Sequence, residues 1–130
     1  MYKLYTDGGS RGNPGPSAIG GVIYDGNKII KQFNECIGIT TNNQAEYRAL
    51  IKGLEIAKDL EIKELECFLD SELVVKQVNR EFKVKDKDLA VLFVRVWNMK
   101  QEFQKITFTH VIREQNFYAD KLVNQALNED

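Results

Sequence analysis

Four acidic residues occupy positions where a carboxylate could do chemistry. Asp7 and Asp70 each end an apolar segment that is typical of a strand, and ligands bind at the carboxyl ends of strands in open α/β sheets. Glu46 shares one face of a predicted helix with apolar residues such as Leu50, where an unpaired glutamate is costly to bury. Asp120 stands in the first turn of the last predicted helix.

Each of these carboxylates also has a structural interpretation when it is taken singly. Asp7 could be a turn residue, Asp70 could cap the following helix, and Asp120 could complement a helix N-terminus. Glu46 could pair with a core-facing arginine. The four residues would have no catalytic role as a set only if all four of these structural interpretations were correct at once.

If the four carboxylates converge, they predict a site for hard divalent cations. Carboxylate oxygens without a nearby histidine or cysteine suit Mg²⁺ or Mn²⁺ rather than zinc, and so many like charges could not stay ionised without a cation. Two such ions, ~3.5–4 Å apart, would clamp the attacking and leaving oxygens of a phosphoryl displacement. The single histidine, His110, lies in a predicted strand, where we expect it packed or partly exposed rather than catalytic.

The elements that must position these residues follow from the periodicity of the apolar residues. The DGN segment at 25–27 predicts a hairpin, and helical connections between the later strands imply parallel pairing. The predicted fold class is therefore α/β, with a five-stranded mixed sheet (three antiparallel strands, then two parallel) flanked by helices, in the order βββαβααβα. The predicted strands are 2–7, 18–25, 28–38, 64–70 and 106–112, and the predicted helices are 42–60, 71–79, 86–103 and 116–127.

The composition is that of one ordinary globular domain, residues 1–130. No apolar run reaches the ~20 residues of a membrane helix, and no signal-peptide pattern opens the chain. Cys36 and Cys67 lack metal-ligand spacing, which predicts two reduced core thiols in a cytoplasmic protein. The net charge of −1 gives no overall sign of nucleic-acid binding, but residues 76–87 carry five basic and two acidic residues. That stretch is either a solvated helix end or a phosphate-facing patch.

Four stretches together resemble the type 1 ribonuclease H family over nearly the whole chain: YTDGGSRGNPGPSAIGGVI, TTNNQAEYRALIKGLEIA, LDSELVVKQV and HVIREQNFYADKLVNQAL. The resemblance implies the ribonuclease H fold and an endonuclease that hydrolyses the RNA strand of RNA·DNA hybrids with two metal ions, leaving 5′-phosphate and 3′-hydroxyl ends. The short connection between 71–79 and 86–103 is similar to the compact bacterial and archaeal branch, which lacks the basic protrusion of larger members.

By this resemblance, Asp7, Glu46, Asp70 and Asp120 are the catalytic residues and the ligands of two Mg²⁺ or Mn²⁺ ions. Asp7 would bridge both ions, Asp120 would help to hold the ion that activates the water, and Glu46 and Asp70 the ion at the leaving oxygen. The glycines of the 6–16 loop would let backbone groups approach a sugar. The predicted substrate-binding residues are Gly8, Gly9, Ser10, Arg11, Asn13, Thr41, Asn42, Asn43, Gln44 and Ser71.

Four more residues are possible accessory groups. Arg113 and Glu114 stand where many relatives carry a histidine, and Arg113 could replace it, pair with Glu114 or bind a phosphate. Lys83 and Lys85 could contact the DNA strand in place of the missing protrusion. The expected partner is an RNA·DNA hybrid, with no membrane, no obligate protein partner and a monomeric state.

Two alternative functions remain open at this level. One is a nuclease of the same fold with broader specificity, acting on double-stranded RNA or RNA–DNA junctions. The other is a non-catalytic nucleic-acid-binding module.

Overall fold

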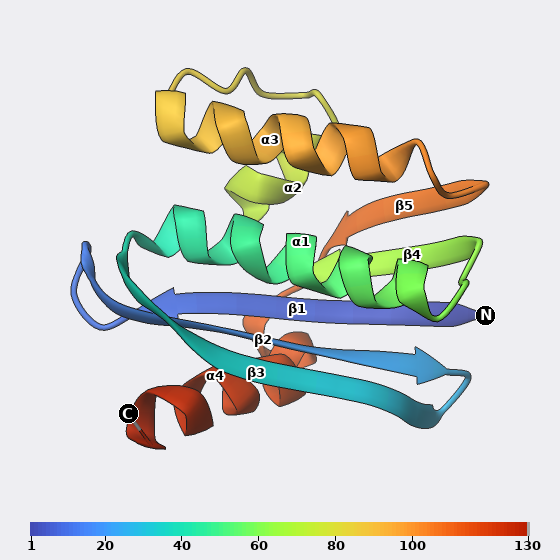
Figure 1. The fold of residues 1–130 in the computed structure, drawn as a ribbon, viewed down its shortest axis with the longest axis horizontal. Coiled ribbons are helices and arrows are strands. Elements are labelled where there is room, and N and C mark those ends of the chain that lie inside the picture. Colours follow the sequence, from blue (N-terminus) through green and yellow to red (C-terminus); the bar gives the residue numbers. More distant parts are fainter. Residues whose placement is uncertain (130) are drawn as a thin grey trace.

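The computed structural model describes residues 1–129, which form a mixed sheet with helices on both faces (Figure 1). The strands are β1 (Tyr2–Ser10), β2 (Gly15–Asp25), β3 (Lys28–Thr40), β4 (Glu64–Leu69) and β5 (Lys105–His110). The helices are α1 (Asn42–Asp59), α2 (Glu72–Val78), α3 (Lys87–Lys100) and α4 (Phe117–Glu129), with a 3₁₀ turn, η1, at Arg113–Asn116.

The five strands lie in the order β3-β2-β1-β4-β5. Pairing is antiparallel between β3, β2 and β1, and parallel between β1, β4 and β5. Both the order of the elements and the mixed sheet confirm the fold class predicted from the sequence. Central β1 therefore has a partner on each side, so its position is held by two ladders of backbone hydrogen bonds.

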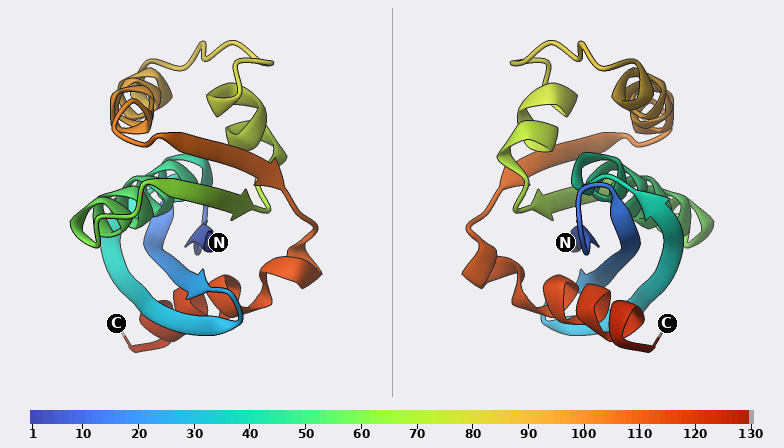
Figure 2. Two further views of the ribbon diagram at one scale, coloured as in Figure 1. Left: turned by 90° about the vertical axis from the view of Figure 1, so that its right-hand side faces the viewer. Right: turned by 90° about the vertical axis from the view of Figure 1, so that its left-hand side faces the viewer.

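Helices cover both faces of the sheet (Figure 2). Two apolar clusters attach them to it. The larger cluster joins α1, α2 and α3 to the strands through fully buried residues such as Leu4, Leu50 and Cys67. The smaller cluster joins α4 to β2 through Ala18 and Val123. The stripe of apolar residues on each helix is thus buried against the sheet or another helix, which is the main source of helix stability in proteins.

The first strand is longer than predicted, because Gly8–Ser10 continue the pairing of β1 with β2. Asp7 consequently lies inside β1 and not at its end, and β2 begins at Gly15, three residues earlier than expected. Glycine has a low intrinsic preference for strands, but pairing and packing override that preference here. The irregular part of the predicted 6–16 loop shrinks to residues 11–14.

Gly8 packs directly against the backbone of α1. A Cβ at this position would lie 2.3 Å from the carbonyl carbon of Ala45, a distance that real Cβ atoms do not tolerate. Gly8 is therefore needed for the packing of α1 against β1, and approach of its backbone to a sugar stays a prediction. The missing side chain lets the first turns of α1 approach β1 closely.

Two hydroxyl caps fix where helices begin. Thr41 caps α1 by accepting a hydrogen bond from the Gln44 N–H at 3.2 Å, and Ser71 caps α2 by accepting from the Val74 N–H at 3.2 Å. Capping of this kind stabilises a helix by about 0.5–2 kcal/mol. Since Ser71 performs it, Asp70 is not the N-cap of α2 and its carboxylate remains available.

Cys36 departs from its predicted environment. Cys67 is buried in the core as expected, but Cys36 is exposed on β3, where its Sγ donates to the Ala126 carbonyl at 3.1 Å. The reason is that β3 is an edge strand with much of its length open to solvent. His110 ends β5 and is exposed. Across residues 1–129, no helix combines the length and the apolar character needed to cross a membrane.

Candidate metal centre and nucleic-acid cleft

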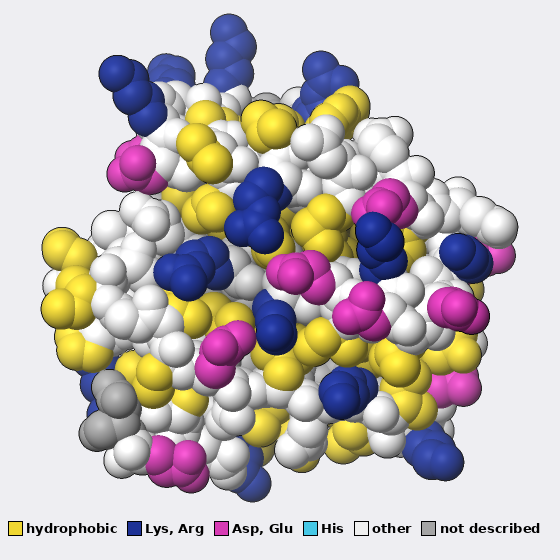
Figure 3. Space-filling model, viewed as in Figure 1, with side chains coloured by type: hydrophobic (Ala, Val, Ile, Leu, Met, Phe, Trp, Pro, Cys, Tyr) yellow, Lys and Arg dark blue, Asp and Glu magenta, His cyan; other side chains and the backbone are white. Residues whose placement is uncertain are grey.

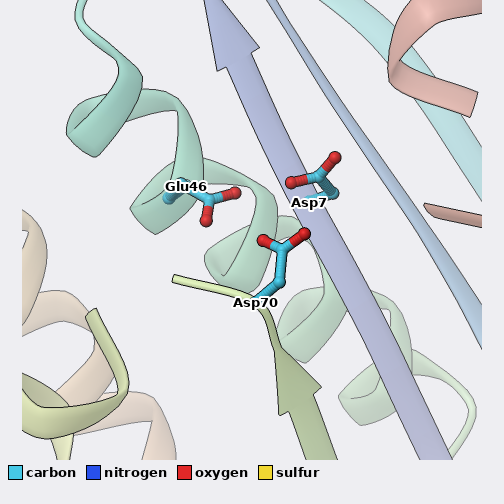
Figure 4. A group of neighbouring side chains, drawn as sticks. All are labelled: Asp7, Glu46 and Asp70. Carbon is cyan, nitrogen blue, oxygen red and sulfur yellow. The ribbon is translucent and has the colours of Figure 1, made fainter. Parts of the chain in front are cut away.

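Three carboxylates from three different elements point toward one another (Figure 4). Asp7 comes from β1, Glu46 from the second turn of α1, and Asp70 directly follows β4. One oxygen of each lies within 4.8 Å of the others. Asp7 and Glu46 are buried, and the Gly8 N–H donates to Glu46 Oε1 at 2.5 Å. The partner of Glu46 is thus a backbone group of β1 and not a core-facing arginine.

The close approach of these groups changes their acidity. Burial, with the charge of Asp70 as the next cause, raises the pKa of Asp7 to about 7. Burial and then the charge of Asp7 raise the pKa of Glu46 well above its usual range, and burial also raises the pKa of Asp70. Three carboxylates held this way resist ionisation together, and a bound cation would relieve that cost. An all-oxygen donor set fits a hard divalent cation.

Asp120 lies beside this group rather than within it. Its charge is one of the causes of the raised pKa of Asp7, so the two carboxylates are close. Two side chains contact the Asp120 carboxylate. Arg113 Nη2 lies 3.4 Å from Oδ1 of Asp120, and Asn124 Nδ2 lies 3.4 Å from Oδ2. Arg113 therefore pairs with Asp120 and not with Glu114. Its side chain is 76% exposed, so the pair is weak and Arg113 can rearrange.

The four carboxylates line one cleft of about 510 Å³. Arg113 lines it as well, beside Asp120. The predicted substrate-binding residues that also line it are Gly8, Gly9, Ser10, Arg11, Asn42, Asn43 and Ser71. Backbone groups and short polar side chains thus surround the carboxylates, and such groups are able to form hydrogen bonds with a ribose hydroxyl.

The other predicted substrate-binding residues do not line the cleft: they are Asn13, Thr41 and Gln44. Asn13 Oδ1 accepts from the Asn42 N–H at 3.1 Å, and Asn42 Oδ1 accepts from the Ser10 N–H at 2.8 Å. Thr41 is engaged as the cap of α1, and Gln44 Oε1 accepts from Thr40 Oγ1 at 2.8 Å. These contacts hold Ser10 and Asn42 in place, and direct contact of Asn13, Thr41 or Gln44 with substrate stays a prediction.

The remaining accessory candidates do not line the cleft. Glu114 is exposed in η1, and Lys83 and Lys85 are exposed in the connection between α2 and α3. Near the same connection, Arg80 lies over the ring of Trp97 at 5.1 Å, and Lys76 over that of Phe82 at 4.9 Å. Aromatic residues therefore anchor the basic side chains that flank this segment.

Two asparagines near Asp120 were not anticipated from the sequence. Asn124 lies one helical turn after Asp120, a four-residue spacing that could have indicated a shared face. Asn116 is buried and donates to the Thr6 carbonyl at 2.8 Å, and its hydrogen bonding to Asp70 opposes the rise in the pKa of that carboxyl. No periodicity marks Asn116, because it lies in η1 before the regular helix begins.

Comparisons with known proteins agree with this geometry. The family model described as Reverse transcriptase-like matches residues 5–126. Ribonuclease HI from Halobacterium salinarum is 44% identical over 126 residues, which cover 96% of this chain and 63% of that protein. A bifunctional protein from Mycobacterium tuberculosis is 43% identical over 127 residues, which cover 96% of this chain and 35% of that protein. The chain thus spans only about a third of the length of the latter.

Solved structures match over nearly the whole chain. The crystal structure of RNase H1 from Halobacterium salinarum superposes with a TM-score of 0.96 at 42% identity, covering 99% of this chain and 98% of that one. The structure of LC11-RNase H1 in complex with an RNA/DNA hybrid gives a TM-score of 0.95 at 41% identity, with the same coverage. These similarities extend from the sheet to the elements that carry the four carboxylates.

Proposed function

Because the chain belongs to the ribonuclease H family, we propose that it is an endonuclease that hydrolyses the RNA strand of RNA·DNA hybrids. The observation that carries the proposal is the convergence of Asp7, Glu46 and Asp70 in a cleft that Asp120 also lines. The solved RNA/DNA complex of a relative supports the choice of substrate. In this proposal residues 1–130 act as one catalytic domain, as a cytoplasmic monomer.

We assign the divalent metal to the four carboxylates. Asp7, Glu46 and Asp70 would hold one ion, and Asp7 with Asp120 would hold a second; Mg²⁺ or Mn²⁺ fits an all-carboxylate set. When bound, the two ions supply an activated water and offset the charge on the leaving 3′-oxygen. The Gly8 N–H orients Glu46, and Arg113 and Asn124 orient Asp120.

Substrate selection falls to the polar wall of the cleft. We propose that the Gly9 and Ser10 backbone, Asn42 and Asn43 contact the minor groove of the hybrid, where a 2′-hydroxyl distinguishes RNA from DNA. The Asn13–Asn42–Ser10 hydrogen bonds fix this wall before substrate arrives. Arg11, whose Nη2 donates to Asn128 Oδ1, can exchange that partner for a phosphate oxygen at the rim.

The decisive experiment is cleavage of labelled RNA·DNA, RNA·RNA and DNA·DNA duplexes with Mg²⁺, Mn²⁺ or EDTA. We expect the RNA strand of the hybrid to be cut with either metal and not with EDTA. Asp7→Asn should abolish cleavage, while Asp25→Asn, at the exposed end of β2, should not.

Other outcomes would replace the proposal. Equal cleavage of RNA·RNA would indicate the broader nuclease, and binding of the hybrid without cleavage in either metal would indicate a non-catalytic binding module. An active Asp7→Asn variant would remove Asp7 from the site.

A further inference from the structure

A second hollow, of about 280 Å³, is lined by residues of β1, β2, the β2–β3 turn, η1 and α4. Three tyrosines line it: Tyr5 from β1, Tyr24 from β2 and Tyr118 from α4. Tyr5 meets Tyr24 edge to face at 5.7 Å and stacks on Phe68 of β4 at 4.8 Å. The sheet thus presents an aromatic surface next to the hollow, on the face where α4 packs on β1, β2 and β3.

The polar groups of the hollow are amides. Asn27, Gln115 and Asn116 line it. Asn116 is 1% exposed, and its Oδ1 accepts no hydrogen bond from any residue that the structure describes. Among the described lining residues only Lys3 is charged.

The hollow adjoins the carboxylate cleft. Tyr5 precedes Asp7 by two residues in β1, so the two side chains share a face of the sheet, about 7 Å apart along the strand. On α4, Tyr118 and Ala119 line the hollow while Asp120 lines the cleft. A nucleic-acid strand held at the carboxylates can therefore continue from the cleft into the hollow.

We propose that this hollow binds an unpaired base of the RNA strand that occupies the cleft, which rests on the proposed function. The tyrosine rings offer stacking surfaces for a base, and amide groups can pair with the donors and acceptors on its edge. Lys3 attracts the adjoining phosphate. The volume is below the ~300–1,000 Å³ of pockets for larger ligands, which suits one planar ring.

The test compares the affinities of a blunt hybrid and of hybrids with a short single-stranded extension on the RNA strand or on the DNA strand. Binding is measured by fluorescence anisotropy in EDTA, so that no turnover occurs. The RNA extension should tighten binding by about tenfold, the effect of stacking one base. Tyr24→Leu and Lys3→Ala should each reduce this gain, whereas Lys31→Ala, an exposed lysine on β3 outside the hollow, should preserve it.

Several results would overturn the inference. The first is an RNA extension that does not increase the affinity of the hybrid for the protein. The second is an unchanged gain in affinity in Tyr24→Leu when the melting curve of this variant shows a folded protein. The third is a gain from the DNA extension that equals the gain from the RNA extension. Cleavage of the blunt hybrid with Mg²⁺ distinguishes failure of the base-binding proposal from failure of the proposed nuclease function. Wild type and Tyr24→Leu should cut the blunt hybrid equally, even where the extension has no effect.

Discussion

Asp7 combines burial with the nearby charges of Asp70 and Asp120, and both features disfavour its charged form. Without metal, the folded state holds the Asp7 proton up to a pH of about 7, whereas the unfolded chain releases it near 4. Between these values the folded protein binds more protons than the unfolded chain, so the free energy of unfolding falls as the pH rises. The contribution of Asp7 to the free energy of unfolding is therefore lost completely above a pH of about 7.

Asp7→Asn should therefore stabilise the metal-free protein at pH 8. We expect the free energy of unfolding to rise by about 1–3 kcal/mol, since each pKa unit is worth ~1.4 kcal/mol and part of the shift is shared with Glu46 and Asp70. The difference should vanish at pH 4, where the wild-type carboxyl is protonated. Urea unfolding in EDTA at both pH values measures it, and equal stabilities at pH 8 would contradict the assigned environment.

Metal should reverse this order. A ligand that binds only the folded state raises the free energy of unfolding by RT ln(1 + [L]/Kd). The midpoint of thermal unfolding of the wild type at pH 8 should rise as Mg²⁺ is added, while that of Asp7→Asn should stay nearly constant. Asp25→Asn serves as the control and should respond like the wild type.

Asn116 is the buried residue that joins η1 to β1. Replacing it with alanine removes a buried donor to the Thr6 carbonyl and the hydrogen bonding to Asp70. We expect Asn116→Ala to cost about 1–3 kcal/mol of stability, the penalty of an unpaired buried polar group. Asn124→Ala, on the exposed side of Asp120, should cost less than 1 kcal/mol. Thermal unfolding of both variants tests the difference.

At the scale of elements, the crossing of α1 over β1 builds the centre of the site. Gly8 provides the close approach and, through its N–H, orients Glu46. One backbone position thus determines both how near the helix lies and where its carboxylate points. The neighbouring glycine is different, because a Cβ at Gly9 would meet only Val123 Cγ1, at 3.4 Å.

Gly8→Ala and Gly9→Ala form a matched pair for this crossing. The first should displace α1, lower the free energy of unfolding by about 1–3 kcal/mol as overpacking does, and reduce hybrid cleavage strongly. The second should leave stability within about 1 kcal/mol of wild type, since its new methyl group makes an ordinary contact. Urea unfolding and cleavage assays distinguish them, and a stable, active Gly8→Ala variant would contradict the packing described.

The order and type of the elements could be predicted from the sequence, because the period of the apolar residues changes clearly between strands and helices. Glu46 could be singled out as well, since a glutamate within an apolar helical stripe requires an explanation. The extension of β1 through Gly8–Ser10 could not, because it depends on contacts with β2 and α1 that are distant in sequence. The pairing of Arg113 with Asp120 rather than Glu114 depends likewise on the turn that η1 makes.

For the whole molecule, the distribution of charge matters more than its net value of −1. Four of the 19 acidic side chains line the cleft, while basic side chains project along the edge of the molecule beside α3 (Figure 3). Lys83 and Lys85 belong to the segment that connects α2 and α3 and are exposed. Such a separation of charge attracts a polyanion to the basic edge and leaves the cleft to metal ions.

Reversing the charges of Lys83 and Lys85 tests this arrangement. The double variant Lys83→Glu and Lys85→Glu should weaken hybrid binding several-fold at low salt and flatten the dependence of affinity on salt, as loss of phosphate contacts does. The control reverses Lys28 and Lys31 on β3. Equal losses in the two double variants would show a general charge effect and no contact at this segment.

The four carboxylates are spread over most of the chain, with Asp7 on the first strand and Asp120 on the last helix of the described residues. During synthesis, β1, α1 and β4 leave the ribosome before α4 exists. A nascent chain that still lacks α4 therefore has an incomplete set of acidic groups. The late docking of α4 would confine nuclease activity to chains that have finished folding.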